Sequence, residues 1–207
     1  MSLAFKKIED IFVSVAKQAE NPPDCYKPFP NLRVVLDCAE FYLQTPENLA
    51  QQSNTYSSYK GCCTVKVLFG TSVFGGLFYV SEAVEGSMTD RKLFLKCGIM
   101  DHLSLGEAVM CDKGFDIEAD LESIGVELLI PAYLGRRECF TARELLINKA
   151  IAGSRIHVEI FIKRVKDFRL IKYKIPNSLL DIVPDMIRVC ANLVNFGESH
   201  ITWSHTD

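Results

Sequence analysis

The run LRVVLDCAE at residues 32–40 constrains the fold more than any other part of the sequence. It is short, largely apolar and rich in β-branched side chains, which is typical of a central strand buried on both faces. Asp37 closes the apolar core of this run. An ionised carboxylate there is costly unless it is paired, hydrogen-bonded or bound to a cation. Asp37 is therefore either a structural residue, starting a turn or pairing with an arginine, or part of a cation site.

The next two predicted strands form a hairpin. Residues 64–73 and 76–83 flank the turn Phe74-Gly75-Gly76, and this arrangement favours two antiparallel strands. With the run at 32–40 they predict an antiparallel meander. The polar stretch 44–61 is predicted to be a loop, whose Tyr, Ser and Lys side chains suit either a solvated turn or a contact with phosphate or bases.

The second half of the sheet is predicted to contain parallel strands. A helix over 90–97, with a capping Ser or Thr just before it, precedes a short apolar strand at 108–111. A helix from about 116 to 125 then leads to a strand at 126–131. This order predicts parallel pairing with a right-handed crossover. The chain is therefore predicted to be an α/β protein with a mixed five-stranded sheet and flanking helices.

A long helical region is predicted after this sheet, from a Thr141 cap to Pro176. Residues 155–169 are its most informative part, because apolar side chains recur mostly at three- and four-residue steps and form one stripe. The stripe comprises Ile147, Ile151, Val158, Ile162 and Val165. A final amphipathic helix is predicted over 178–196.

Glu159 lies within a row of basic residues beside that stripe, formed by Arg155, Lys163 and Lys166. Surface Glu–Lys pairs of this kind contribute a few tenths of a kcal/mol each to a helix. Alternatively, Glu159 is a metal ligand and the neighbouring cations hold a phosphate backbone. Residues 155–174 carry seven Lys or Arg against two acids in a chain of net charge -3, which suggests a localised polyanion contact.

The remaining composition indicates an intracellular globular protein. The eight cysteines show no C-x-x-C pair and several lie in apolar runs, so they are expected to be reduced core residues without a zinc site. No apolar run approaches the length of a membrane span, and no membrane partner is expected. The length of 207 residues suits one domain with an arm. We expect a helix over 3–19 within an N-terminal helix and linker at 1–31, one domain at 32–196 and a tail at 197–207.

Three carboxylates stand out when these elements are combined. Asp37 and Asp112 each follow the apolar core of a strand, and Glu159 is presented by the long helix. Ligands of open α/β sheets gather at the carboxyl ends of strands, where the two aspartates would lie if their strands are parallel neighbours. Oxygen ligands without a His or Cys set suit Mg²⁺ or Mn²⁺. Two such ions can activate a water and stabilise the leaving oxygen at a phosphodiester.

Six motifs occur in a characteristic order: VVLDCAE, YSSYKG followed by TVK, EGSMTD, AVMCDKGF, LLIPAY and RIHVEIFIKRVKDFRL. Together they resemble the catalytic domain of DDE-superfamily transposases and endonucleases, closest to the Harbinger-like group of mobile elements in animals and plants. The resemblance covers roughly residues 32–195. It implies an RNase H-like fold, a divalent metal cofactor (Mg²⁺ or Mn²⁺), a nuclear location, or alternatively a cytoplasmic one, and DNA as substrate, both transposon ends and target.

The resemblance also implies roles for individual residues. The catalytic, metal-binding triad maps to Asp37, Asp112 and Glu159, whereas Asp90 lies in a motif that supplies no ligand. Five further positions match the family and are expected to contact DNA or order the site: Lys60, Arg155, His157, Arg164 and Lys166.

Two positions depart from the family pattern. Ile160 follows Glu159 where the family usually has arginine, and Lys163 stands where it usually has glycine. The family's usual N-terminal DNA-binding domain is not recognisable, so a separate DNA-binding protein or a homo-oligomer is a candidate partner. The expected function is that of a two-metal DNA endonuclease or transposase. The alternatives are a catalytically decayed or domesticated nuclear protein that binds DNA or protein, and a cytosolic RNase H-like ribonuclease.

Overall fold

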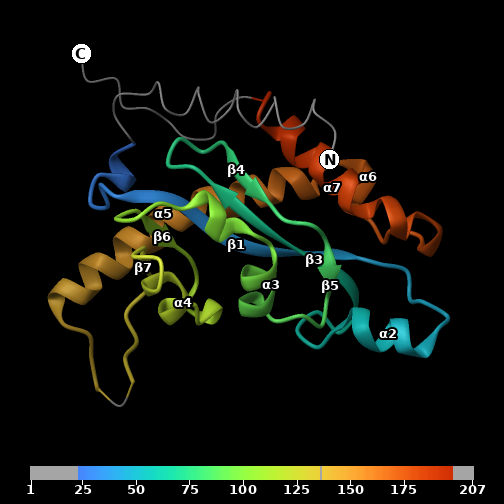
Figure 1. The fold of residues 1–207 in the computed structure, drawn as a ribbon, viewed down its shortest axis with the longest axis horizontal. Helices are drawn as coiled ribbons and strands as arrows, with labels where there is room; N and C mark the ends of the chain where they lie inside the picture. The colour runs from blue at the N-terminus through green and yellow to red at the C-terminus, as the bar shows by residue number, and fades with distance from the viewer. Residues whose placement is uncertain (1–22, 136, 198–207) are drawn as a thin grey trace.

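The computed structural model describes residues 23–135 and 137–197. The helix predicted over 3–19 and nearly all of the predicted tail at 197–207 lie outside the described residues. Within them a mixed sheet is flanked by helices on both faces (Figure 1). This arrangement is consistent with an RNase H-like fold, and the predicted α/β class is confirmed.

The sheet is built around β1 (Leu32–Tyr42). Its strand order is β2-β3-β1-β6-β7, and β4 and β5 also pair with β3. β1 runs antiparallel to β3 and parallel to β6, and β6 runs parallel to β7. The other strands are β2 (Tyr56–Ser57), β3 (Cys62–Thr71), β4 (Leu77–Val80), β5 (Val84–Glu85), β6 (Ala108–Met110) and β7 (Glu127–Leu129).

Five of these strands match the prediction, including the β3–β4 hairpin and the parallel β6–β7 pair. The hairpin turns at Gly75, whose φ of +80° suits glycine. The two-residue strands β2 and β5 are additions, because segments this short carry no periodic signal.

Helices cover the two faces differently. Residues of β1 alternate between two hydrophobic clusters, with Val35 and Ala39 in one and Val34 and Leu36 in the other. The first cluster contains the buried sides of α5 (Ala142–Lys166) and α7 (Val183–Val194). The second contains those of α3 (Asp90–Lys96) and α4 (Glu118–Glu122). β1 is thus buried on both faces, as predicted.

α5 is the longest helix and begins where the sequence predicts. Thr141 and Glu144 form a capping box, in which each side chain accepts a hydrogen bond from the backbone N–H of the other residue. The helix ends at Lys166, before the predicted end of the helical region at Pro176, because Asp167 forms its C-cap and the separate helix α6 (Arg169–Lys172) follows. Of the predicted stripe, Ile147 is 39% exposed and the other members are buried.

Two further expectations need correction. The stretch 44–61, predicted to be a loop, contains α2 (Leu49–Thr55), whose N-cap Asn48 accepts hydrogen bonds from Ala50 N and Gln51 N. The final helix is shorter than predicted, because 3-10 helix η4 (Asn177–Ile182) precedes α7. Pro184 in the first turn of α7 is tolerated there but not in a helix interior.

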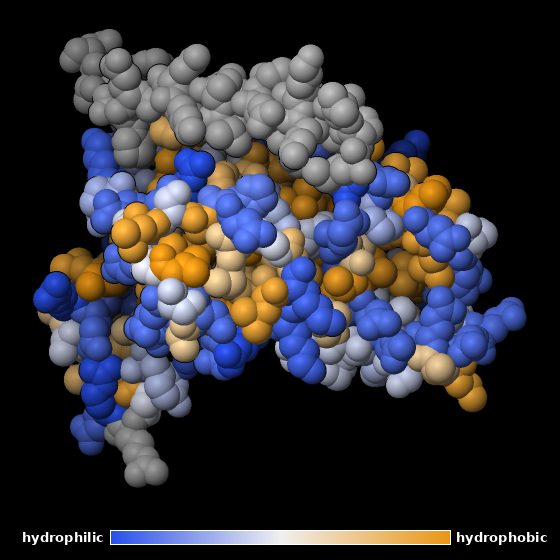
Figure 2. Space-filling view, viewed as in Figure 1, coloured by the Kyte–Doolittle hydropathy of each residue, from blue (hydrophilic) through white to orange (hydrophobic). Residues whose placement is uncertain are grey.

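Short 3-10 helices complete the chain: η1 (Asp24–Tyr26), η2 (Ile99–His102) and η3 (Lys113–Phe115). All eight cysteines are free thiols, and Cys63, Cys111 and Cys190 are buried. On the face seen in Figure 2, hydrophilic side chains alternate with hydrophobic patches.

Candidate active site

The parallel pairing of β1 and β6 places Asp37 and Asp112 in matching positions. Val35 pairs with Met110, and each aspartate follows its member of this pair by two residues. Both aspartates therefore lie at the carboxyl edge of the parallel pair, as the sequence predicts. Asp37 is not at the end of its strand, however, because β1 continues to Tyr42 through its antiparallel pairing with β3.

Glu159 reaches this edge from α5. Val158 and Ile162 are buried against the sheet, which leaves the Glu159 side chain on the neighbouring face of the helix with 55% exposure. Arg155, one turn earlier, connects it to Asp112. Its Nη2 lies 3.7 Å from Glu159 Oε1, and its Nη1 lies 3.3 Å from Asp112 Oδ1. The guanidinium of Arg155 thus links the turn that follows β6 to helix α5.

The electrostatics of Asp37 reflect this crowding. Burial raises the pKa of Asp37 to about 6, and the charges of Glu159 and Asp112 add to the rise. The charge of Arg155 and the hydrogen bond from Cys38 N, 2.9 Å long, oppose it. The pKa stays raised because Arg155 and the hydrogen bond do not fully compensate the ionised Asp37 for its burial.

Asp112 is held by its own turn. It is the N-cap of η3, and its Oδ1 accepts a hydrogen bond of 2.8 Å from Lys113 N. Lys113 Nζ lies 3.3 Å from the ring centroid of the exposed Tyr133. This cation–π pair beside Asp112 joins two of the sequence motifs, and nothing in the sequence predicts the contact.

The donor set suits a hard divalent cation. Asp37, Asp112 and Glu159 offer only carboxylate oxygens, which Mg²⁺ and Mn²⁺ prefer. Among residues 23–135 and 137–197, no group of three or more Asp, Glu, His or Cys side chains is arranged closely enough to hold a metal ion. The Arg155 guanidinium lies between Asp112 and Glu159 as a stand-in cation. The carboxylate oxygens therefore suit the metal. In this structure, however, the Arg155 guanidinium lies between two of the three carboxylates.

Two predicted DNA-binding residues lie near each other. Burial lowers the pKa of Lys166, and the positive charge of Lys60 lowers it further, while Asp37 raises it. Lys166 Nζ lies 5.5 Å from the ring centroid of Phe41, and Lys60 Nζ lies 4.4 Å from that of Tyr59. Two lysines placed near each other raise the local positive potential, which attracts anions.

The other predicted DNA contacts are placed differently. Arg155 engages the carboxylates, as described. His157 Nε2 lies 3.4 Å from Cys25 Sγ, and its ring packs against that of Tyr26 in η1. Arg164 is half-buried on α5. A DNA contact for these residues stays a prediction.

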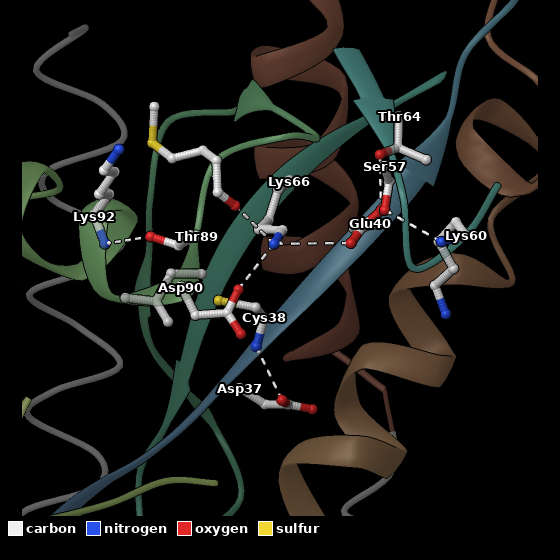
Figure 3. Close-up of polar contacts among 12 residues, drawn as sticks. Asp37, Cys38, Glu40, Ser57, Lys60, Thr64, Lys66, Thr89, Asp90 and Lys92 are labelled. Carbon is white, nitrogen blue, oxygen red and sulfur yellow. Dashed lines mark hydrogen bonds and ion pairs between the residues drawn. The ribbon is translucent and has the colours of Figure 1, made fainter. Parts of the chain in front are cut away.

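Sequence reasoning missed a polar cluster on the other face of the sheet. Lys66 Nζ donates to Asp90 Oδ1 at 2.9 Å and to Met88 O at 2.8 Å, and Glu40 Oε1 lies 3.8 Å away. Figure 3 shows this cluster, with the Asp37 carboxylate extending away from Asp90 and Lys66. Asp90 is thus paired with a lysine on the opposite face from Asp37.

Comparison with known proteins identifies a family. Residues 36–195 match the family described as DDE superfamily endonuclease, a range that includes all three carboxylates. A search among curated proteins finds no match. Within the described part of the chain, none of the helices has the length and apolar character required to cross a membrane. The resemblance noted in the sequence is confirmed at the level of the family: the chain belongs to the DDE superfamily endonucleases, which supports a nuclease or transposase role with DNA as substrate.

Proposed function

We propose that this chain is a divalent-metal-dependent DNA endonuclease or transposase domain of the Harbinger-like type, with Asp37, Asp112 and Glu159 as catalytic metal ligands. The observation that carries the proposal is the register of β1 and β6, which places two aspartates at one edge opposite Glu159. When bound, Mg²⁺ or Mn²⁺ activates a water molecule and stabilises the leaving oxygen of a phosphodiester.

The residues around the triad have separate tasks in this proposal. Asp37, which is the most deeply enclosed of the three and has a raised pKa, is the ligand whose ionised form gains most from a cation. Lys60 and Lys166 hold the phosphate backbone beside the cut, because the charge of Lys166 interacts with both Asp37 and Lys60, and the Lys166 side chain lies against Phe41.

The test combines binding with cleavage. Purified protein is titrated with Mn²⁺ by calorimetry and assayed for nicking of supercoiled plasmid in Mg²⁺ or Mn²⁺. We expect Asp37→Asn, Asp112→Asn and Glu159→Gln each to abolish nicking and weaken Mn²⁺ binding. Glu118→Gln, an exposed change in α4, is the control and is expected to leave both unchanged. Nicking that persists in all three variants would exclude the proposed site.

A second candidate, a transposase-derived protein that binds DNA or a partner without cutting, is favoured by two observations. Ile160 offers no guanidinium beside Glu159, and Arg155 separates Glu159 from Asp112. In that case salt-dependent DNA binding persists, Mn²⁺ binding does not depend on the carboxylates, and no nicking occurs. Calorimetry with Mn²⁺ separates the two candidates before any assay on DNA.

A further inference from the structure

Arg155 is more enclosed than the two carboxylates that it contacts at this edge. Its side chain is only 15% exposed, whereas those of Asp112 and Glu159 are each 55% exposed. Its positive charge also acts on Asp37. One guanidinium therefore neutralises part of the repulsion among three acidic side chains. Without it, Asp112 and Glu159 would lose the guanidinium that lies between them.

The contacts of this guanidinium are loose. Its distances to Asp112 and Glu159 are 3.3 and 3.7 Å, longer than the roughly 2.7–2.9 Å of strong charge-assisted hydrogen bonds. Its Nε is buried and has no hydrogen-bond partner among the described residues. A bidentate arginine–carboxylate pair would satisfy these donors and fix the side chain. Arg155 is instead held mainly by charge, so relocating its head group breaks few hydrogen bonds.

We propose that Arg155 is a built-in counter-cation, which holds the carboxylates together in the metal-free protein and leaves the space between Asp112 and Glu159 when a divalent ion enters. The inference rests on the proposed metal site and makes Arg155 a positioning residue that sets metal affinity. Arg155 and Glu159 are one turn apart on α5, so the proposed exchange moves the Arg155 side chain and leaves the helix in place.

The test changes the charge of residue 155 in the full chain and measures stability and metal affinity. In Arg155→Gln, the melting temperature in EDTA at pH 7.5 is expected to fall, because the carboxylates repel one another. Mn²⁺ affinity measured by calorimetry is expected to rise on the order of tenfold, because no guanidinium competes with the ion. A purely structural arginine would lower both values. Arg143→Gln removes an exposed charge from the same helix and is expected to change neither.

Arg155→Lys provides a second measurement if Arg155→Gln does not fold. Lysine keeps the charge on a flexible stem without the planar fork, so its Mn²⁺ affinity is expected to lie between those of wild type and Arg155→Gln. A folded Arg155→Lys protein that binds Mn²⁺ no more tightly than wild type would overturn the inference.

The outcomes separate this inference from the proposed function. If wild type binds Mn²⁺ through its carboxylates and Arg155→Gln binds equally or more weakly, the function stands and the inference fails. If wild type does not bind and Arg155→Gln does, the arginine blocks the site, which supports the inference and favours the non-cutting candidate. If neither binds, both are overturned.

Discussion

Lys66 and Asp90 form an ion pair of 2.9 Å on the face of the sheet opposite to Asp37. The lysine belongs to β3, and the aspartate is the first residue of α3. The pair therefore ties the start of this helix to the centre of the sheet. Asp90 in its Gly-Ser-Met-Thr-Asp motif thus has a structural explanation, and the metal ligands are expected to come from the other face.

We predict that Asp90→Asn lowers the free energy of unfolding by about 1–2 kcal/mol, because Lys66 loses its closest carboxylate but keeps Met88 O and the nearby Glu40. Mn²⁺ binding by the folded protein is expected to be unchanged. Urea denaturation and calorimetry measure the two effects. The double variant Lys66→Met/Asp90→Asn should be less destabilised than the sum of the single changes. Weaker Mn²⁺ binding in folded Asp90→Asn would make Asp90 part of the metal site.

The raised pKa of Asp37 leads us to predict that stability depends on pH. Its pKa in the folded protein is about 6, above the ordinary value of 3.8, so the folded state holds the proton more tightly than the unfolded state does. The stabilisation from the protonated form is complete below pH 3.8 and is lost as the pH rises through about 6.

Asp37→Asn, which resembles the protonated form, is therefore expected to be more stable than wild type by about 2 to 3 kcal/mol at pH 8 without metal. The difference should vanish near pH 4, and denaturation in EDTA across this range measures it. Saturating Mn²⁺ should reverse the order at pH 8, because only the carboxylate binds the ion. A difference that does not change with pH would contradict the assignment.

Lys60 and Lys166 are expected to contact phosphate, not bases. Lys60→Gln and Lys166→Gln should each weaken binding to duplex DNA of any sequence. Each should also reduce the slope of log K against log salt by about 1, since one counterion-releasing contact is lost. Lys96→Gln, at the end of α3 on the other face of the sheet, is the control. Fluorescence anisotropy at several salt concentrations measures the slope, and an equal effect of the control would indicate non-specific attraction.

Gly86 is predicted to be intolerant of any side chain. A Cβ at this position would lie 2.0 Å from Thr64 Oγ1 and 2.8 Å from the backbone oxygens of Thr55 and Thr64. Gly86→Ala should therefore cost roughly 1–3 kcal/mol through displacement of β3 or α2. Gly153→Ala, in open space on α5, should instead stabilise the protein by about 0.5–1 kcal/mol. Thermal denaturation compares the two, and a neutral Gly86→Ala would argue against this close approach.

The sequence was most informative where one physical signal decided the structure. The apolar run around Val35 and the capping residue Thr141 predicted β1 and the start of α5 correctly, because burial and capping act locally. The helix α2 was missed because its seven residues, Leu49–Thr55, carry no apolar stripe and depend on the Asn48 cap. Short segments of this kind are stabilised by contacts that no local pattern records.

In the candidate site, too, some features could be predicted from the sequence and others could not. Asp37 and Asp112 could be paired in advance because parallel strands bring their carboxyl ends to one edge. The position of Arg155 between Asp112 and Glu159 could not be predicted. A basic residue one turn before an acid usually indicates a simple surface pair. The contact of Lys113 with Tyr133 depends on the path of the loop after β7, which no periodicity specifies.

Because α5 is a single continuous helix, it fixes the distance between the side chains that it carries. Glu159 and Lys166 are seven residues apart, so they lie on the same side of the helix and about 10 Å apart along its axis. If the proposed function is correct, a single helix therefore fixes the distance between the metal ligand Glu159 and the lysine that holds the phosphate backbone.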